Sequence, residues 1–337
     1  MASEPTPISD PIPWDAVATP LSQAEDALAR FDERLRTSPI RDGVVARLDF
    51  ADACACLWLA GELVTPEDLV LHDAERDLRI PSHALTQAHT VLRTRRRIAR
   101  QPAGWALLPP GLADLRGLSE RGGEGPLTTQ DRDGTAPTTL MPLAHAARDP
   151  LIFDPDWDEE ARLTAWQVSL AANQHHPPVL AAALAWDAWE RTAPLQHRPW
   201  LGPLLVGSIL YARGKARSHL PCLHLGLRHV ERAQRRPHDR ATRLLGFVQA
   251  CTAAASEGLK QHDRLILAHQ LLAHRVRGHR STSHLPALID LAIARPLVST
   301  TLIADELAVS GRAAQNLIRE LGLREITGRG RYRAWAI

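Results

Sequence analysis

The stretch STTLIADELAVSGRAAQNLIREL at residues 299–321 decides the fold of the C-terminal part of this chain. Its first half places apolar residues at helical spacing and predicts a helix that begins near Ser299 or Thr300. In the turn that follows, Val309 is expected to be buried and Ser310 to cap the next helix. That next helix covers about 311–321, so the stretch is typical of a helix-turn-helix.

The flanking residues extend this motif into a winged helix-turn-helix over 284–337. Residues 285–294 predict a first helix, and residues 323–326 and 331–335 alternate as two short strands. The loop between the strands, TGRG at 327–330, supplies the glycines that a hairpin tip needs.

The polar face of the 311–321 helix carries side chains that suit DNA. The small residues at its start allow close approach to the major groove, and Arg312, Gln315 and Arg319 can reach base edges or phosphates. From Arg324 onward there are four arginines and one acidic residue, so the wing is basic and suits phosphates or the minor groove. The residues expected to contact double-stranded DNA are Ser310, Arg312, Gln315, Asn316, Arg319, Arg324, Arg329, Arg331 and Arg333.

Helical periodicity continues through the rest of the chain, almost without strand patterns, and predicts a mainly α protein that is at least half helical. Trp186 and Trp189 lie three residues apart on one helix face and are expected in the core. The helices are expected at about 22–37, 43–60, 66 onward, 82–100, 157–174, 177–192, 201–213 and 237–276.

Changes in composition predict five parts. The first part, 1–20, is rich in proline and polar residues and is expected to be flexible, and 117–142 has the composition of a linker or long loop. The others are an N-terminal helical region at 21–116, a second helical domain at 143–283 and the winged helix-turn-helix at 284–337.

Charge and apolar content narrow the class of protein. The 337 residues are 45% hydrophobic and 23% charged with a net charge of +2, so any affinity for DNA must come from a local patch. No apolar run reaches 18 residues and the N-terminus lacks a basic start, so neither a membrane span nor a secretory signal is expected. Four cysteines without a CxxC pair indicate buried free thiols in a reducing cytoplasm: Cys54, Cys56, Cys222 and Cys251.

Two runs of histidine repeat every five residues, a spacing that moves side chains around a helix instead of lining one face. They are therefore expected at the surface or in partner contacts, and no metal site is expected. The two runs are His219, His224 and His229, and His269, His274, His279 and His284.

A cluster of arginines ends the helix predicted at 82–100. It is expected to form a solvated last turn favoured by the helix macrodipole, with contact to DNA phosphates as the alternative. The cluster is Arg93, Arg95, Arg96, Arg97 and Arg100.

The middle of the chain resembles the Fic fold. The segment PVLAAALAWDAWERTAPL at 178–195 is similar to its central helix and following turn, and the similarity continues through 204–214 and 220–225. The segment at 57–69 resembles the N-terminal inhibitory helix of Fic proteins, and 295–333 resembles the winged-helix tail that many of them carry. The whole layout also resembles uncharacterised proteobacterial proteins that carry a helix-turn-helix DNA-binding domain.

Fic enzymes transfer a nucleotide moiety to a protein hydroxyl, with the motif His-Pro-Phe-x-(Asp/Glu)-Gly-Asn-Gly-Arg. The matching stretch here is APLQHRPWL at 193–201, in which only Pro194 is kept. The positions of the general base and the phosphate-pairing arginine hold Ala193 and Leu201, and His197 replaces the acidic magnesium ligand. The glycine positions hold Arg198 and Trp200, and Pro199 has no N–H group to offer a phosphate.

The segment that resembles the inhibitory helix has also lost its key residue, because Ala60 stands at the position of the inhibitory glutamate. The resemblance therefore implies a Fic-like domain that has lost its catalytic motif and needs no cofactor.

Three hypotheses remain for the function. The first is a sequence-specific DNA-binding protein, a transcriptional regulator that is cytoplasmic and homodimeric, with the inactive Fic-like domain serving dimerisation or partner contact. The second is a protein-interaction module that does not bind DNA, because a fold does not fix a function. The third is a divergent nucleotide transferase that uses His197 or Arg198.

Overall fold

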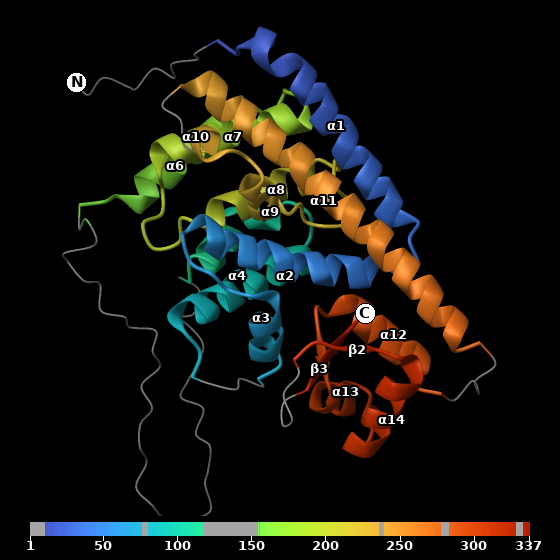
Figure 1. Cartoon of the computed structure of the whole chain (residues 1–337). Coiled ribbons are helices and arrows are strands. Elements are labelled where there is room, and N and C mark those ends of the chain that lie inside the picture. The colour runs from blue at the N-terminus through green and yellow to red at the C-terminus, as the bar shows by residue number, and fades with distance from the viewer. Residues whose placement is uncertain are drawn as a thin grey trace, which may run out of the picture.

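The computed structural model describes residues 11–75, 80–117, 154, 156–235, 239–277, 283–327 and 333–337. Of these described residues 71% are helical, which confirms the prediction of a mainly α protein (Figure 1). The linker predicted at 117–142 lies outside the described residues apart from Gly117, and so do residues 1–10.

The helices before the C-terminal domain form one body around a shared hydrophobic core. A short 3-10 turn, η1, covers Trp105–Leu107. The α-helices are α1 Trp14–Arg36, α2 Arg41–Leu59, α3 Pro66–Asp73, α4 His83–Arg100, α5 Pro109–Leu115, α6 Glu159–Ala172, α7 Pro178–Thr192, α8 Leu201–Ala212, α9 Leu223–Arg228, α10 Arg232–Arg235 and α11 Arg240–Arg275.

The N-terminal boundary differs from the expectation. Helix α1 begins at Trp14, so residues 14–20 are helical and not flexible as predicted. Pro20 lies inside this helix, in its second turn, and Val17 and Leu21 are buried on its inner face. The burial of these apolar side chains stabilises a turn whose proline-rich composition indicated flexibility.

Helices α7 and α8 form the centre of the body, and nearly all their residues are buried. The indole of Trp186 stacks on Phe247 of α11, while Trp189 meets Trp166 of α6 edge to face. Both predicted core tryptophans are thus confirmed as core residues. Gly202 belongs to the same packing, because a Cβ there would lie 2.3 Å from Nε1 of Trp189.

The C-terminal domain combines three helices with a three-stranded sheet. Its helices are α12 Leu285–Ala294, α13 Thr300–Glu306 and α14 Gly311–Leu321. The strands β1 Val298–Ser299, β2 Arg324–Glu325 and β3 Ala334–Ala336 pair antiparallel in the order β1-β3-β2. The wing strands were predicted, and β1, which is only two residues long, was not.

This domain is packed on the helical body through α2 and α11 (Figure 1). A Cβ on Gly43 of α2 would lie 2.6 Å from the side chain of Ile293, so the backbones approach closely there. The carboxylate of Asp73, at the end of α3, accepts hydrogen bonds from Arg96 of α4 at 2.7 Å and from Arg295 at 2.6 Å. Burial opposes the charge of Asp73, but hydrogen bonds from His89, Arg96 and Arg295 hold its pKa well below the usual range.

Two expectations about surface residues are wrong. In the arginine cluster, Arg95 is buried and Arg96 is half-buried in its pair with Asp73. Arg93, Arg97 and Arg100 are exposed and match the solvated turn, and Arg97 also pairs with Asp114. Of the histidines, His219 and His224 are buried in the body. The prediction of buried free cysteines is confirmed for all four. Within the described ranges no helix is long and apolar enough to cross a membrane.

Candidate nucleic-acid interface

The second helix of the helix-turn-helix, α14, is fixed at both ends. Its N-cap is Ser310, whose hydroxyl accepts from the N–H of Ala313 at 3.2 Å. At the other end Gly322 takes a left-handed conformation with φ 70°, which glycine adopts without strain. Ser310 is thus a capping residue, as the sequence predicts, and Val309 is half-buried against the core.

Helix α14 is strongly two-sided. Ala314, Ile318 and Leu321 are buried against the rest of the domain. The side chains of the opposite face are exposed, and Arg319 donates to Asn316 within that face at 3.3 Å. Four predicted DNA contacts therefore share one open surface, which we call the α14 face: Arg312, Gln315, Asn316 and Arg319.

The predicted DNA-contacting arginines of the wing differ in exposure and in their partners. Arg324 of β2 is exposed. Arg333 is exposed too, but it makes a two-pronged ion pair with Glu325 and lies over the ring of Trp335. Arg329 and Arg331 lie outside the described residues.

Figure 1 shows α13 and α14 at the end of the C-terminal domain that points away from α2. The helical body contacts the C-terminal end of α14, where Arg275 of α11 donates a hydrogen bond to the backbone oxygen of Leu321 at 3.2 Å. The body therefore leaves the α14 face open to a partner.

The loop at 193–201, which matches the Fic motif position by position, is fastened to its surroundings. Ala193 ends α7 in a left-handed conformation with φ 40°. The side-chain amide of Gln196 exchanges hydrogen bonds with the backbone of Asp154. The backbone N–H of Gln196 donates a hydrogen bond to the carboxylate of Glu159 at 3.2 Å. Arg198 donates to the backbone oxygen of Leu115 at the end of α5, at 2.6 Å.

The start of α8 offers few donors to an anion. The N–H groups of Leu201 and Gly202 donate to the backbone oxygens of Arg198 and Pro199, at 2.9 and 3.3 Å. The next residue is Pro203, which has no N–H group. The indole of Trp189 lies directly against Gly202. The amides of the first three residues of α8, where an anion would bind a helix N-terminus, are thus engaged or missing.

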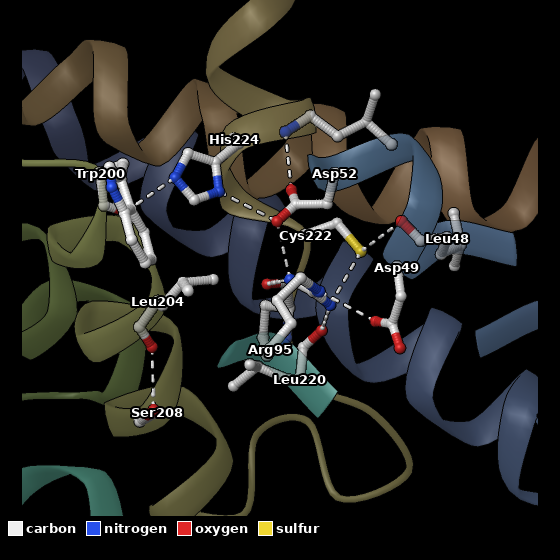
Figure 2. A network of polar contacts seen from close by, with 12 residues as sticks. Leu48, Asp49, Asp52, Arg95, Trp200, Leu204, Ser208, Leu220, Cys222 and His224 are labelled. Carbon is white, nitrogen blue, oxygen red and sulfur yellow. Dashed lines mark hydrogen bonds and ion pairs between the residues drawn. The ribbon is translucent and has the colours of Figure 1, made fainter. Parts of the chain in front are cut away.

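A buried polar network lies behind this loop (Figure 2). His224 of α9 contacts the backbone oxygen of Trp200 through Nε2 and the Asp52 carboxylate through Nδ1, both at 3.0 Å. Arg95 of α4 donates to Asp49 at 2.9 Å and to Asp52 at 2.8 Å. Arg95 also donates to the backbone oxygens of Leu220 and Pro221, at 2.7 and 3.2 Å.

The electrostatics of the network follow from burial and pairing. Burial disfavours the charge of His224, but Cys56 and Asp52 outweigh it and raise the pKa of His224 to about 10. Burial would raise the pKa of Asp52, yet Arg95 and His224 hold it below its ordinary value. Burial outweighs the guanidinium of Arg95 at Asp49 and raises the pKa of that carboxyl. The side chains of this closed core are engaged in packing α2, α4 and α9 together.

Two models of protein families match separate parts of this chain. A family model described as "HTH DNA binding domain" matches residues 285–337, and one described as "Protein of unknown function (DUF1612)" matches residues 151–277. Among solved structures, a Fic family protein from Desulfovibrio desulfuricans G20 superposes with a TM-score of 0.50, covering 99% of this chain and 98% of that one. Its sequence identity is 14%, so the likeness shows a Fic-like fold alone.

A curated relative spans almost the whole molecule. The "Uncharacterized protein y4cF" of Sinorhizobium fredii (strain NBRC 101917 / NGR234) is 40% identical over 368 aligned positions, which cover 96% of this chain and 97% of the relative. The chain has a Fic-like helical body followed by a helix-turn-helix DNA-binding domain. It belongs to the same protein family as y4cF.

Proposed function

We propose that this protein is a sequence-specific DNA-binding regulator of transcription, built on a Fic-like body that has no catalytic activity. The observation that carries the proposal is the α14 face, where two guanidinium groups and two amides point outward from a well-capped helix. Arginine pairs with guanine or phosphate and an amide pairs with adenine in the major groove. The match of the domain to the DNA-binding family supports the same partner.

The proposal includes a location and an oligomeric state. A regulator of transcription works beside the chromosome, so we place the protein in the cytoplasm. Helix-turn-helix proteins read symmetric operators as dimers. We therefore propose a homodimer.

Selection of bound duplexes from a random DNA pool tests the function directly. The full chain is expected to enrich one sequence motif with two-fold symmetry, and a gel shift on that motif is expected to survive an excess of scrambled DNA. Failure to enrich any motif contradicts the proposal. That result favours the alternative in which the winged helix binds a protein.

Loss of catalysis is supported by the loop at 193–201. Ala193 has no group to accept a proton, and the amides at the start of α8 are engaged or missing. Incubation with radiolabelled ATP and magnesium is expected to leave the chain and candidate proteins unlabelled. Labelling that His197→Ala abolishes would instead identify a divergent nucleotide transferase.

A further inference from the structure

We infer that the helical body makes a DNA contact of its own, through the last turn of α11 and the residues just after it. This segment, 274–277, is called the α11 end, and Arg275 and Arg277 are the residues that bind backbone phosphates. The inference rests on the proposed function, because it adds part of the Fic-like body to the DNA-binding surface. It is supported by a hydrogen bond to α14, by the exposure of the two arginines and by the charges around them.

Arg275 joins the body to the C-terminal end of α14. Its Nη1 donates a hydrogen bond to the backbone oxygen of Leu321, the last residue of that helix, at 3.2 Å. Gly322 belongs to the same contact, because a Cβ there would lie 3.1 Å from Nη1 of Arg275. The α11 end is thus held beside the helix that is proposed to enter the major groove.

Capping of α14 engages only part of the guanidinium of Arg275. An arginine carries five N–H donors, and the hydrogen bond to Leu321 engages one of them. Arg275 is nevertheless exposed, and so is Arg277. Neither arginine forms an ion pair with a carboxylate in the part of the chain that the structure describes. Both side chains therefore keep charged donors for a ligand.

Further arginines surround the same end of α14. Arg319 lies on its last turn and Arg324 opens β2 just beyond it, and both are exposed. Of the nearby carboxylates, Glu325 is paired with Arg333, and Glu320 is exposed on α14. The sequence from 264 to 277 contains neither aspartate nor glutamate. Four guanidinium groups from α11, α14 and β2 thus give this end of the helix a positive charge.

DNA phosphates are the ligand that this position favours. Helix α14 has 11 residues and is roughly 16 Å long at 1.5 Å per residue, whereas the major groove is about 12 Å wide. Helix-turn-helix proteins set the N-terminal residues of this helix against base edges, so its C-terminal end lies toward the bordering backbone. Arginine binds phosphate through charge-assisted hydrogen bonds. The α11 end therefore contacts phosphates outside the bases that α14 reads, and it continues the surface of the domain that matches the DNA-binding family.

The contact makes affinity depend on the body and leaves sequence preference to α14. Phosphate contacts fix the position of a protein on the duplex but carry no direct sequence information. Each phosphate that an arginine neutralises adds about 0.9 to the slope of the logarithm of the binding constant against the logarithm of the salt concentration. The α11 end therefore contributes about two units of this slope, equally on selected and scrambled duplexes.

Equilibrium binding of the full chain to a selected and a scrambled duplex, across a salt series, tests the contact. Arg275→Ala and Arg277→Ala are each expected to lower the salt slope by about one unit and to weaken binding to both duplexes roughly five- to tenfold at 0.1 M salt. The motif that the chain selects is expected to stay the same. The matched control is Lys260→Ala, which removes one exposed charge from α11 roughly 22 Å before Arg275 and is expected to bind as the wild type does. Thermal melting shows that each variant is folded.

Arg277→Ala separates a DNA contact from a cap of α14, because Arg275 is the residue that bonds to that helix. A wild-type salt slope in Arg277→Ala, or an equal loss of slope in Lys260→Ala, would overturn the inference. If the wild type selects a DNA motif and the α11 variants keep its slope, only this inference is wrong and the proposed function stands. If the wild type selects no motif and binds neither duplex, both the proposed function and the phosphate contact are wrong.

Discussion

Arg47 of α2 caps the C-terminal end of α12 through the backbone oxygen of Ile293, to which its Nε donates at 2.9 Å. Its Nη2 donates to the backbone oxygens of Ala292, at 2.6 Å, and of Arg295. Burial and the nearby Arg264 lower the pKa of Arg47 to about 10, so the side chain stays charged at neutral pH. One buried cation thus neutralises the negative end of a helix and joins the body to the DNA-binding domain.

Replacement of Arg47 by methionine is expected to lower the free energy of unfolding by about 3 kcal/mol, because buried carbonyl groups lose charged donors. Urea denaturation of the full chain measures the change. Arg41→Met on the exposed first turn of the same helix is the control, and it is expected to change stability little. A loss at Arg47 no larger than that of the control would mean that the domain contact does not depend on this cap.

Arg95→Met is expected to lower the free energy of unfolding by about 3–5 kcal/mol, because it leaves Asp49 and Asp52 buried without their cation. Denaturation midpoints compare this variant with Arg93→Met, an exposed position on the same helix. Equal effects of the two substitutions would contradict the placement of Arg95 in the core.

The stability that His224 contributes is expected to decline at alkaline pH. Its pKa in the folded chain is about 10, above its ordinary value of 6.5, so the protonated form stabilises the fold. This contribution is complete below pH 6.5 and is lost as the pH rises toward 10. Urea denaturation at pH 7 and pH 9.5 should show that the stability difference between the wild type and His224→Gln shrinks with pH. A constant difference would contradict a charged His224.

The fold was predictable where local patterns agree with tertiary packing. Spacing of apolar residues located α14, and the hydroxyl of Ser310 marked its start. The early start of α1 was not predictable from composition, because tertiary burial of Val17 and Leu21 stabilises a proline-containing turn. Strand β1 was not predictable, because its two residues run directly into α13 and no alternating segment surrounds them.

The buried network was hidden inside a run of arginines that suggested a solvated surface. A signal was present, because Arg95 continues the apolar row of Ala88, Val91 and Leu92 at helical spacing. An arginine on the buried face of a helix indicates a paired cation. Its partners come from α2 and from the residues just before α9, distant in sequence, so the pairing itself could not be predicted.

The tip of the wing is expected to contact DNA phosphates. Removing both Arg329 and Arg331 by alanine substitution should weaken binding to all duplexes alike and lower the salt slope by roughly one unit for each arginine that binds a phosphate. Titration of one duplex across a salt series measures that slope. Arg93→Ala on α4 is the control, and a change there in place of the wing would instead assign the phosphate contact to α4.

The central claim is that α14 reads DNA sequence, and equilibrium binding of α14 variants to selected and scrambled duplexes tests it most directly. Gln315→Ala is expected to weaken the binding free energy for the selected site by about 1–3 kcal/mol and to relax the base preference there, while binding to scrambled DNA stays unchanged. Arg319→Ala is expected to weaken binding to the selected site as well. If both variants bind the two duplexes as the wild type does, the α14 face is not a DNA-reading surface and the winged helix serves another partner.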